Sequence, residues 1–148
     1  MTDQALTTRR TGVVDSLSAN EFAIELEGVR VSGIFKIGGF IPFRLDVKPT
    51  QIKFDRPPFK ISRMVQRDPT LPFNQWIQET IKVKEDIVRP KHTLALVALD
   101  DGVETRRWTV KSAWISEIAY SDFDAGSGAL VEETTTIQYE SIDESWAG

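Results

Sequence analysis

Apolar and polar positions alternate along the first strongly patterned stretch of the chain. Its apolar positions lie two residues apart, at Phe22, Ile24 and Leu26. A period of two is typical of a β-strand with one buried face and one polar face. Gly28 ends this pattern, and residues 29–37 after it predict the return strand of a hairpin.

Strand and loop signals are mixed between residues 40 and 59. Apolar and polar positions alternate over residues 43–48, and residues 52–54 are a candidate for another short strand. Prolines recur through the segment, at Pro42, Pro49, Pro57 and Pro58. Because proline cannot donate a hydrogen bond to a strand ladder, this segment is not a central strand. We expect one extended strand and a long loop here, followed by a strand over residues 61–65.

A single helix is predicted after residues 68–72. This Asp-Pro-Thr-Leu-Pro sequence offers capping side chains, and its prolines stand no later than the first turn. The stripe that follows has the i, i+3, i+4, i+7 spacing of one helix face. Its members are Phe73, Trp76, Ile77, Thr80, Ile81 and Lys84.

Strand patterns return in the second half of the chain. Residues 94–99 form a nearly continuous apolar run, and Asp100-Asp101-Gly102 has the chemistry of a hairpin turn. Further strand patterns cover residues 107–110, 113–120 and 131–139. The whole pattern predicts a mainly β (α+β) fold, an antiparallel β-barrel or sandwich with one flanking α-helix.

Composition adds limits to this picture. The 148 residues fit one domain, which we expect over residues 20–148 after a polar N-terminal arm over residues 1–19. A net charge of -4 opposes a dedicated nucleic-acid binder, and the absence of cysteine excludes disulfides and thiolate metal sites. The chain shows no secretory signal segment and no apolar run near the roughly 20 residues that span a bilayer.

The sequence offers only weak candidates for catalytic or metal-binding residues. His92 is the only histidine and lies beside a lysine and a proline at the start of a strand pattern, where a structural role is the more frequent one. Asp122, Asp124 and Glu133 echo the spacing of a calcium loop, but Ser127 stands where the sharp turn needs glycine. An ordinary turn is therefore favoured over a calcium site. We expect no catalytic residue, no cofactor and no metal.

The order of these features resembles the tail tube proteins of contractile phages and phage-derived injection systems, with the Hcp rings of type VI secretion as structural relatives. In the first half the matching segments are the strand at 20–28, the glycine-bearing hairpin at 33–40, and the strand and Trp-bearing helix over 61–77. In the second half they are the Asp-Gly turn, Arg107-Trp108, Ser112-Ala113-Trp114-Ile115, residues 121–125 and the Glu/Thr-rich strand at 132–140. The family has Asn-Ala-Trp-Pro where this chain has Ser-Ala-Trp-Ile.

The resemblance implies homohexameric rings that stack into a tube around a lumen. A strand that lines such a channel is polar on its lumen face, and the last strand pattern has this alternation. The candidate lumen-facing residues are Glu25, Glu132, Thr134, Thr136, Gln138 and Glu140. Their glutamates predict a negative wall past which an acidic cargo slides. Any half-exposed strand shows the same alternation, so the pattern by itself leaves both interpretations open.

In this family the long loop contacts the neighbouring ring. The candidate inter-ring residues in this chain are Pro42, Phe43, Arg44, Phe54, Arg56 and Phe59. The other partners that the resemblance implies are a contractile sheath protein, the baseplate or spike hub, a tube terminator, and DNA or effector cargo held without sequence-specific contacts. Assembly in the bacterial cytoplasm would precede incorporation into a virion tail or injection particle.

Two alternatives to a main tube subunit stay open. The first is a baseplate or tube-initiator adaptor of the same family. The second is a monomeric β-barrel binding module, which would need a concave pocket with inward polar groups. Stacked rings, single rings or monomers would distinguish the three.

Overall fold

The protein is described by a computed structural model that covers residues 16–147. The first fifteen residues of the predicted arm lie outside this range. The described chain contains ten strands and one helix. In chain order they are β1 (Phe22–Leu26), β2 (Val29–Val31), β3 (Ile34–Gly38), β4 (Leu45–Lys48), β5 (Gln51–Phe54), β6 (Phe59–Met64), α1 (Pro72–Lys82), β7 (His92–Asp100), β8 (Val103–Tyr120), β9 (Glu132–Gln138) and β10 (Ser141–Trp146).

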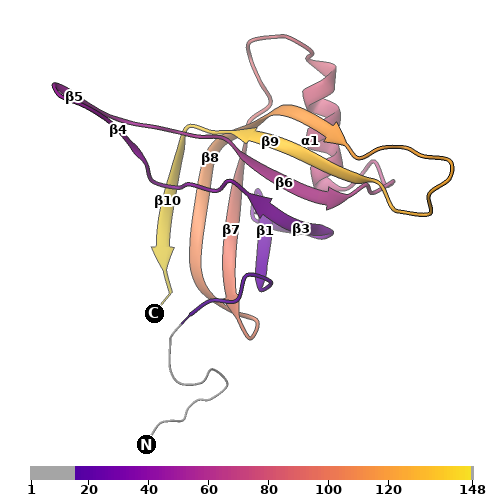
Figure 1. Ribbon diagram of the computed structural model, residues 1–148, viewed down its shortest axis with the longest axis horizontal. Coiled ribbons are helices and arrows are strands. Elements are labelled where there is room, and N and C mark those ends of the chain that lie inside the picture. Colours follow the sequence, from indigo (N-terminus) through magenta and orange to yellow (C-terminus); the bar gives the residue numbers. More distant parts are fainter. Residues whose placement is uncertain (1–15, 148) are drawn as a thin grey trace, which may run out of the picture.

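One antiparallel sheet with the order β2-β1-β7-β8-β9-β6-β3 makes up the body of the molecule (Figure 1). The long strand β8 belongs to two layers. Its first half pairs with β7 on one side and β10 on the other, whereas its second half pairs with β9. The first layer is therefore β2, β1, β7, β10 and the start of β8, and the second layer is the end of β8 with β9, β6 and β3.

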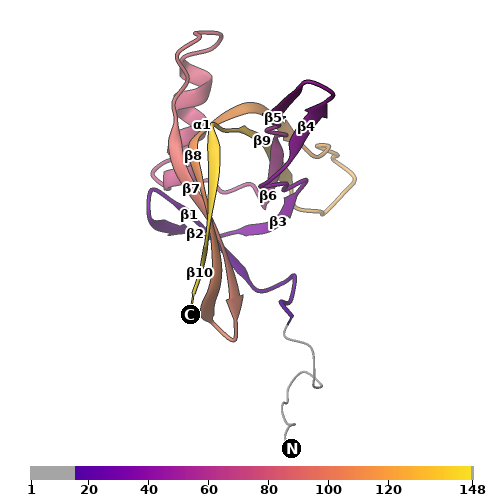
Figure 2. The ribbon, with the colours of Figure 1, turned by 90° about the vertical axis from the view of Figure 1, so that its left-hand side faces the viewer.

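The bend between the layers has a local cause in β8. Ser112 adopts a left-handed backbone conformation with φ of 54°, and the pairing with β7 shifts register between His92 and Leu94 opposite it. A second shift lies between Ile115 and Glu117. Bulges of this kind increase the local bend and twist of a strand. They fold the sheet over on itself (Figure 2), so the predicted β fold is confirmed in its sandwich form and not as a closed barrel.

The core lies between the two layers and the helix. Alternate residues of the facing strands enter it, and α1 adds one apolar face. Its fully buried members include Ile61, Phe73, Trp76, Leu94, Ile115 and Ile137. The indole nitrogen of Trp76 donates to the Pro90 carbonyl at 3.1 Å, so this buried polar group is satisfied.

Several sequence-based expectations about elements were wrong. The strand β3 pairs with β6, so it does not continue the hairpin formed by β1 and β2. The extended strand and the candidate strand at 52–54 are confirmed as β4 and β5, but they pair as a separate hairpin where a long loop was expected, and β10 was not predicted. Pairing across these distances in sequence depends on tertiary contacts that periodicity does not report.

The helix begins and ends differently from its prediction. Leu71 is the N-cap and makes no side-chain capping bond; the Asp68 carboxylate instead accepts hydrogen bonds from the backbone and hydroxyl of Thr70, which lowers the pKa of Asp68. The helix ends at Lys82. Ile81 is 58% exposed and Lys84 lies beyond the helix, so neither belongs to the buried stripe.

Candidate assembly surfaces

The strand β9 has one face in the core and one face outside. Glu133, Thr135 and Ile137 are buried opposite Arg63, Ile61 and Phe59 of β6. The alternate residues of β9 therefore point away from the core, as the sequence pattern predicted. These are Glu132, Thr134, Thr136 and Gln138.

This outer face, which we call the β9 face, is rich in hydroxyl groups. Thr134 lies 3.2 Å from the hydroxyl of Ser62, and the Gln138 amide donates to the Ser116 hydroxyl at 3.1 Å. Thr136 differs from the others because only 8% of it is exposed and its hydroxyl donates to Glu117 at 3.1 Å. The cross-strand polar bonds hold these side chains in place on the sheet.

Glu25 lies on the other layer, apart from the β9 face. Arg107 of β8 reaches across β7 and donates to the Glu25 carboxylate at 2.7 Å and to Glu104 at 2.8 Å. The small side chains of Ala95 and Val97 lie beneath it and are buried. The hydrogen bond from Arg107 lowers the pKa of Glu104, and the two carboxylates raise the pKa of Arg107. Glu25 is thus ion-paired, but one guanidinium serves two carboxylates, so the cluster as a whole keeps a net negative charge.

Glu140 occupies the short break between β9 and β10. Its backbone amide donates to the Lys111 carbonyl at 3.0 Å, and its carbonyl accepts a bond from Arg56. The structure therefore brings together four of the six candidate lumen residues on β9, places Glu140 just beyond them, and leaves Glu25 on a different layer.

The hairpin β4–β5 projects from the body of the molecule (Figure 1). Phe43 and Phe54 contact each other edge to face at 5.7 Å, and Arg44 pairs with Asp55 at 3.0 Å. These contacts join the two arms of the hairpin at its base. Its apolar residues share one face and are all exposed; they are Phe43, Leu45, Val47, Ile52 and Phe54.

One candidate inter-ring residue is a core residue. Phe59 is 3% exposed and packs against Phe40 at 5.3 Å and Tyr139 at 5.8 Å. It begins β6 on the inward face, so it is not available for contact with another copy. The sequence prediction for Phe59 was wrong because Pro57 and Pro58 made residue 59 read as part of the loop, although Phe59 and Ile61 follow the two-residue period of β6. Pro42 and Arg56 lie near the base of the hairpin, beside Tyr139.

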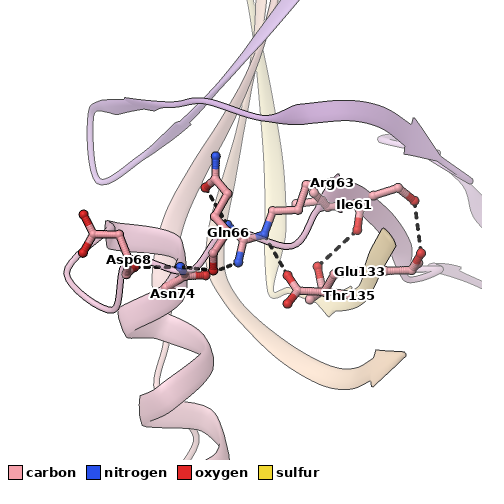
Figure 3. Close-up of polar contacts among 9 residues, drawn as sticks. Ile61, Arg63, Gln66, Asp68, Asn74, Glu133 and Thr135 are labelled. Carbon is pink, nitrogen blue, oxygen red and sulfur yellow. Dashed lines mark hydrogen bonds and ion pairs between the residues drawn. The ribbon is translucent and has the colours of Figure 1, made fainter. Parts of the chain in front are cut away.

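A buried ion pair fixes the helix to the second layer (Figure 3). Arg63 donates to Glu133 at 2.7 Å and to Gln66 at 3.1 Å, and its guanidinium also bonds to Asn74 of α1. The same guanidinium lies 4.6 Å from the ring centre of Phe73. Each partner is hydrogen-bonded, as a buried charge requires. The signal missed in the sequence was opposite charges at inward positions of two strands.

Residues 121–131 form an exposed loop between β8 and β9. Phe123 is 80% exposed and Leu130 is 73% exposed at this loop. The alternative calcium site fails here because Glu133 is engaged by Arg63. Within residues 16–147, no set of three or more histidine, aspartate or glutamate side chains is arranged to hold a metal ion.

His92 links three elements. Its two ring nitrogens lie 3.0 Å from Glu27 and 2.9 Å from Glu79, and its ring contacts Trp76 edge to face. These contacts tie the start of β7 to the end of β1 and to α1. They describe a structural role, in agreement with the sequence-based interpretation.

Comparison with solved structures identifies proteins that share this fold. The tube terminating cap of the anti-feeding prophage is similar with a TM-score of 0.72 at 17% identity, over 97% of this chain and 100% of that chain. The sheath-tube complex of the extracellular contractile injection system PVC matches with a TM-score of 0.72 at 12% identity over the same shares. Hcp1 from Flavobacterium johnsoniae matches with a TM-score of 0.56 at 10% identity, over 86% of this chain and 96% of that chain.

The fold is therefore that of a structural tube protein of the contractile injection kind. The family model described as T4-like virus tail tube protein gp19 matches residues 42–143. The chain belongs to this tail tube family, which confirms the resemblance drawn from its motifs. A search of curated protein sequences finds no match. Among the described residues, no helix combines the length and apolar character needed to cross a membrane.

Proposed function

We propose that copies of this chain form hexameric rings that stack into the inner tube of a contractile tail or injection particle. The observation that carries this proposal is the hairpin β4–β5, whose apolar face is left uncovered by the rest of residues 16–147. An exposed apolar surface of this kind marks a contact with another protein. Family membership and the open edges of the folded sheet support a partner that is a further copy of the same chain.

The tube would be a conduit for DNA or effector cargo. We propose that the β9 face lines the lumen, with Glu132, Thr134 and Gln138 exposed to it. A wall of hydroxyl, amide and carboxylate groups offers few cations to a polyanion, which favours passage without binding. Glu25 lies on the other layer and contributes little to this charge.

The surrounding partners follow from a place in such a particle. A sheath protein outside the tube, a baseplate or spike hub at one end and a terminator at the other would complete it, after assembly in the bacterial cytoplasm. A second candidate is an end ring, either a terminator or a baseplate adaptor. The similarity to a tube terminating cap has the same TM-score as the similarity to a sheath-tube complex. This supports the end ring as a second candidate function.

Electron microscopy of the purified protein tests these candidates. Stacked rings with a central channel are expected for a main tube subunit, and single rings for an end subunit. A monomer that persists at high concentration in sedimentation would contradict assembly and favour a binding module. A reconstructed channel with a strongly basic wall would contradict the lumen assignment alone.

A further inference from the structure

We propose that the segment between α1 and β7 of one copy docks in an apolar groove of its neighbour within the same ring. This inference rests on the proposed function, because it assumes that copies form rings. It identifies the two surfaces that meet side by side. We call them the connection (residues 83–91) and the β3 groove, which lies where β3 faces β1, β7 and β8.

The β3 groove is a largely apolar cavity of about 430 Å³ that is open to solvent. One side comes from β3, the other from β1, β7 and β8, and the segment 17–21 completes the lining. Its apolar side chains include Phe22, Phe35, Ile37, Leu96 and Trp108. Of these, Phe35 is the most open at 44% exposed. An open apolar groove of this kind is a place for apolar side chains of another chain.

The connection holds two neighbouring aliphatic side chains in solvent. Ile87 is 92% exposed and Val88 is 73% exposed. Docking in the β3 groove would remove both from water, together with the open part of Phe35. Removal of apolar surface from water is the main source of favourable free energy in association.

Hydrogen bonds fix the shape of the connection before any partner arrives. The Asp86 carboxylate accepts from the Val88 amide at 3.1 Å. Arg89 donates to the carbonyls of Lys84 at 2.5 Å and of Asp86 at 2.9 Å. A segment that is ordered in advance loses less entropy on binding.

The charged groups of the two surfaces are complementary. The groove carries Lys36 and the connection carries Glu85; both are exposed, and neither has an ion-pair partner within residues 16–147. The groove also carries Glu21, and the connection has Lys84 and Lys91 to set against it. Complementary charges of this kind fix the orientation in which two surfaces meet.

The two surfaces lie at opposite ends of the molecule. Figure 1 shows the connection above α1 at the top, and the indigo segment 16–21 at the bottom. The view turned by 90° shows the same order (Figure 2). A ring closes through a contact between two different surfaces of identical copies. Each copy can therefore give its connection to one neighbour and its groove to the other.

Cysteine cross-linking tests the contact directly, because the chain has no native cysteine. The double variant Phe35→Cys/Ile87→Cys, oxidised in the assembled state, should give covalent oligomers on a non-reducing gel. They should extend to the hexamer and no further, because the contact closes within one ring. The matched control Phe123→Cys/Ile87→Cys replaces a more exposed phenylalanine outside the groove and should give none. The same samples are imaged for rings.

Charge exchange supplies a second readout. Lys36→Glu should raise the protein concentration needed for rings by about tenfold, because two acidic groups would then face each other. Glu85→Lys should have the same effect, and the chain with both changes should regain assembly. Lys53→Glu, on the β4–β5 hairpin, is the control and should leave ring formation unchanged. Sedimentation velocity against concentration measures the fraction of chains in rings.

The outcomes separate this inference from the proposed function. Rings without cross-linked oligomers would mean that another segment fills the groove, which overturns this contact and leaves the tube function intact. Oligomers larger than the hexamer overturn it as well, because they join separate rings. If the double-cysteine chain forms no ring, the charge exchange decides: rings that are indifferent to it overturn the contact. Absence of any ring in the unmodified protein removes the proposed function and this inference with it.

Discussion

Arg63 is a fully buried cation that holds three parts of the molecule together. Its partners come from β9, from the connection before the helix and from α1 itself. A buried charge is costly to remove from water, so the network is stable only while every partner is present. The position of α1 against the second layer therefore depends on Arg63, because the N-cap residue Leu71 makes no side-chain capping bond.

Replacing Arg63 by methionine should destabilise the fold strongly. The change leaves Glu133 buried without its partner, and breaking a buried pair in this way costs about 3–5 kcal/mol. Arg63→Met/Glu133→Leu should recover part of the loss, because no unpaired charge remains. Urea unfolding at fixed protein concentration measures the free energy of unfolding. Lys60→Met, on the outer face of the same strand, is the control; a loss as large there would contradict the argument.

Tyr139 should make stability fall at alkaline pH. Burial, with the nearby charge of Asp55, raises the pKa of Tyr139, and its hydroxyl donates to the Pro57 carbonyl at 2.8 Å. The folded state therefore favours the protonated phenol. Its contribution is fully present below the ordinary tyrosine pKa of about 10 and is lost as pH rises above it.

The variant Tyr139→Phe tests this pH dependence. It should lose about 1 kcal/mol at neutral pH with the hydrogen bond, and its unfolding free energy should decline less steeply above pH of about 10. Urea midpoints from neutral to alkaline pH give the comparison. If the unfolding free energies of the two proteins fell equally steeply with pH, Tyr139 would not be the cause of the loss of stability at alkaline pH.

At the scale of elements, β8 decides the architecture. It takes part in both layers, and Ser112 adopts its left-handed conformation where the strand bends. A side chain in this conformation is strained, whereas glycine adopts it freely. Asparagine, which the family pattern has at this position, also tolerates it better than serine.

Ser112→Gly should therefore stabilise the protein by about 0.5–1 kcal/mol, with Ser112→Asn smaller in the same direction. Ser116→Gly, in the same strand without a left-handed backbone, should instead lower stability. Thermal unfolding of the three variants provides the measurement. A loss of stability in Ser112→Gly would mean that the bend is not strained at this residue.

At the scale of the whole molecule, the hairpin β4–β5 is separate from the folding core. Within the described part of the chain its two strands pair only with each other, and all eight of their residues are exposed. The chain keeps an amphipathic hairpin that adds nothing to its own core. This is the arrangement expected of a segment whose cover comes from another copy.

Removal of the hairpin should separate folding from assembly. The backbone of Asp55 donates to the Arg44 carbonyl at 2.8 Å, so an Asn-Gly turn can replace residues 45–54 between these two. We expect the urea midpoint to change little and stacked tubes to disappear, leaving rings. Electron microscopy and circular dichroism on the same sample give both results. Tubes of normal length would contradict a stacking role for the hairpin.

The sequence by itself determined the faces of individual elements. Its period of two correctly placed Ile24, Leu26 and Ile137 in the core, and its helical period correctly placed Phe73 and Trp76. Ordered motifs gave the tail tube family, which the family model confirms. These features are local, because a side chain's face depends only on its position within its own strand or helix.

Only the tertiary structure decided which elements meet. In the structure, β3 pairs with β6 and does not extend the first hairpin, and Phe59 is buried. Glu25 pairs with Arg107 across an intervening strand. Arg63 likewise pairs with Glu133, which is 70 residues away in the chain. Periodicity carries no record of a strand's neighbour, because pairing is set by contacts between distant segments and by the bend in β8.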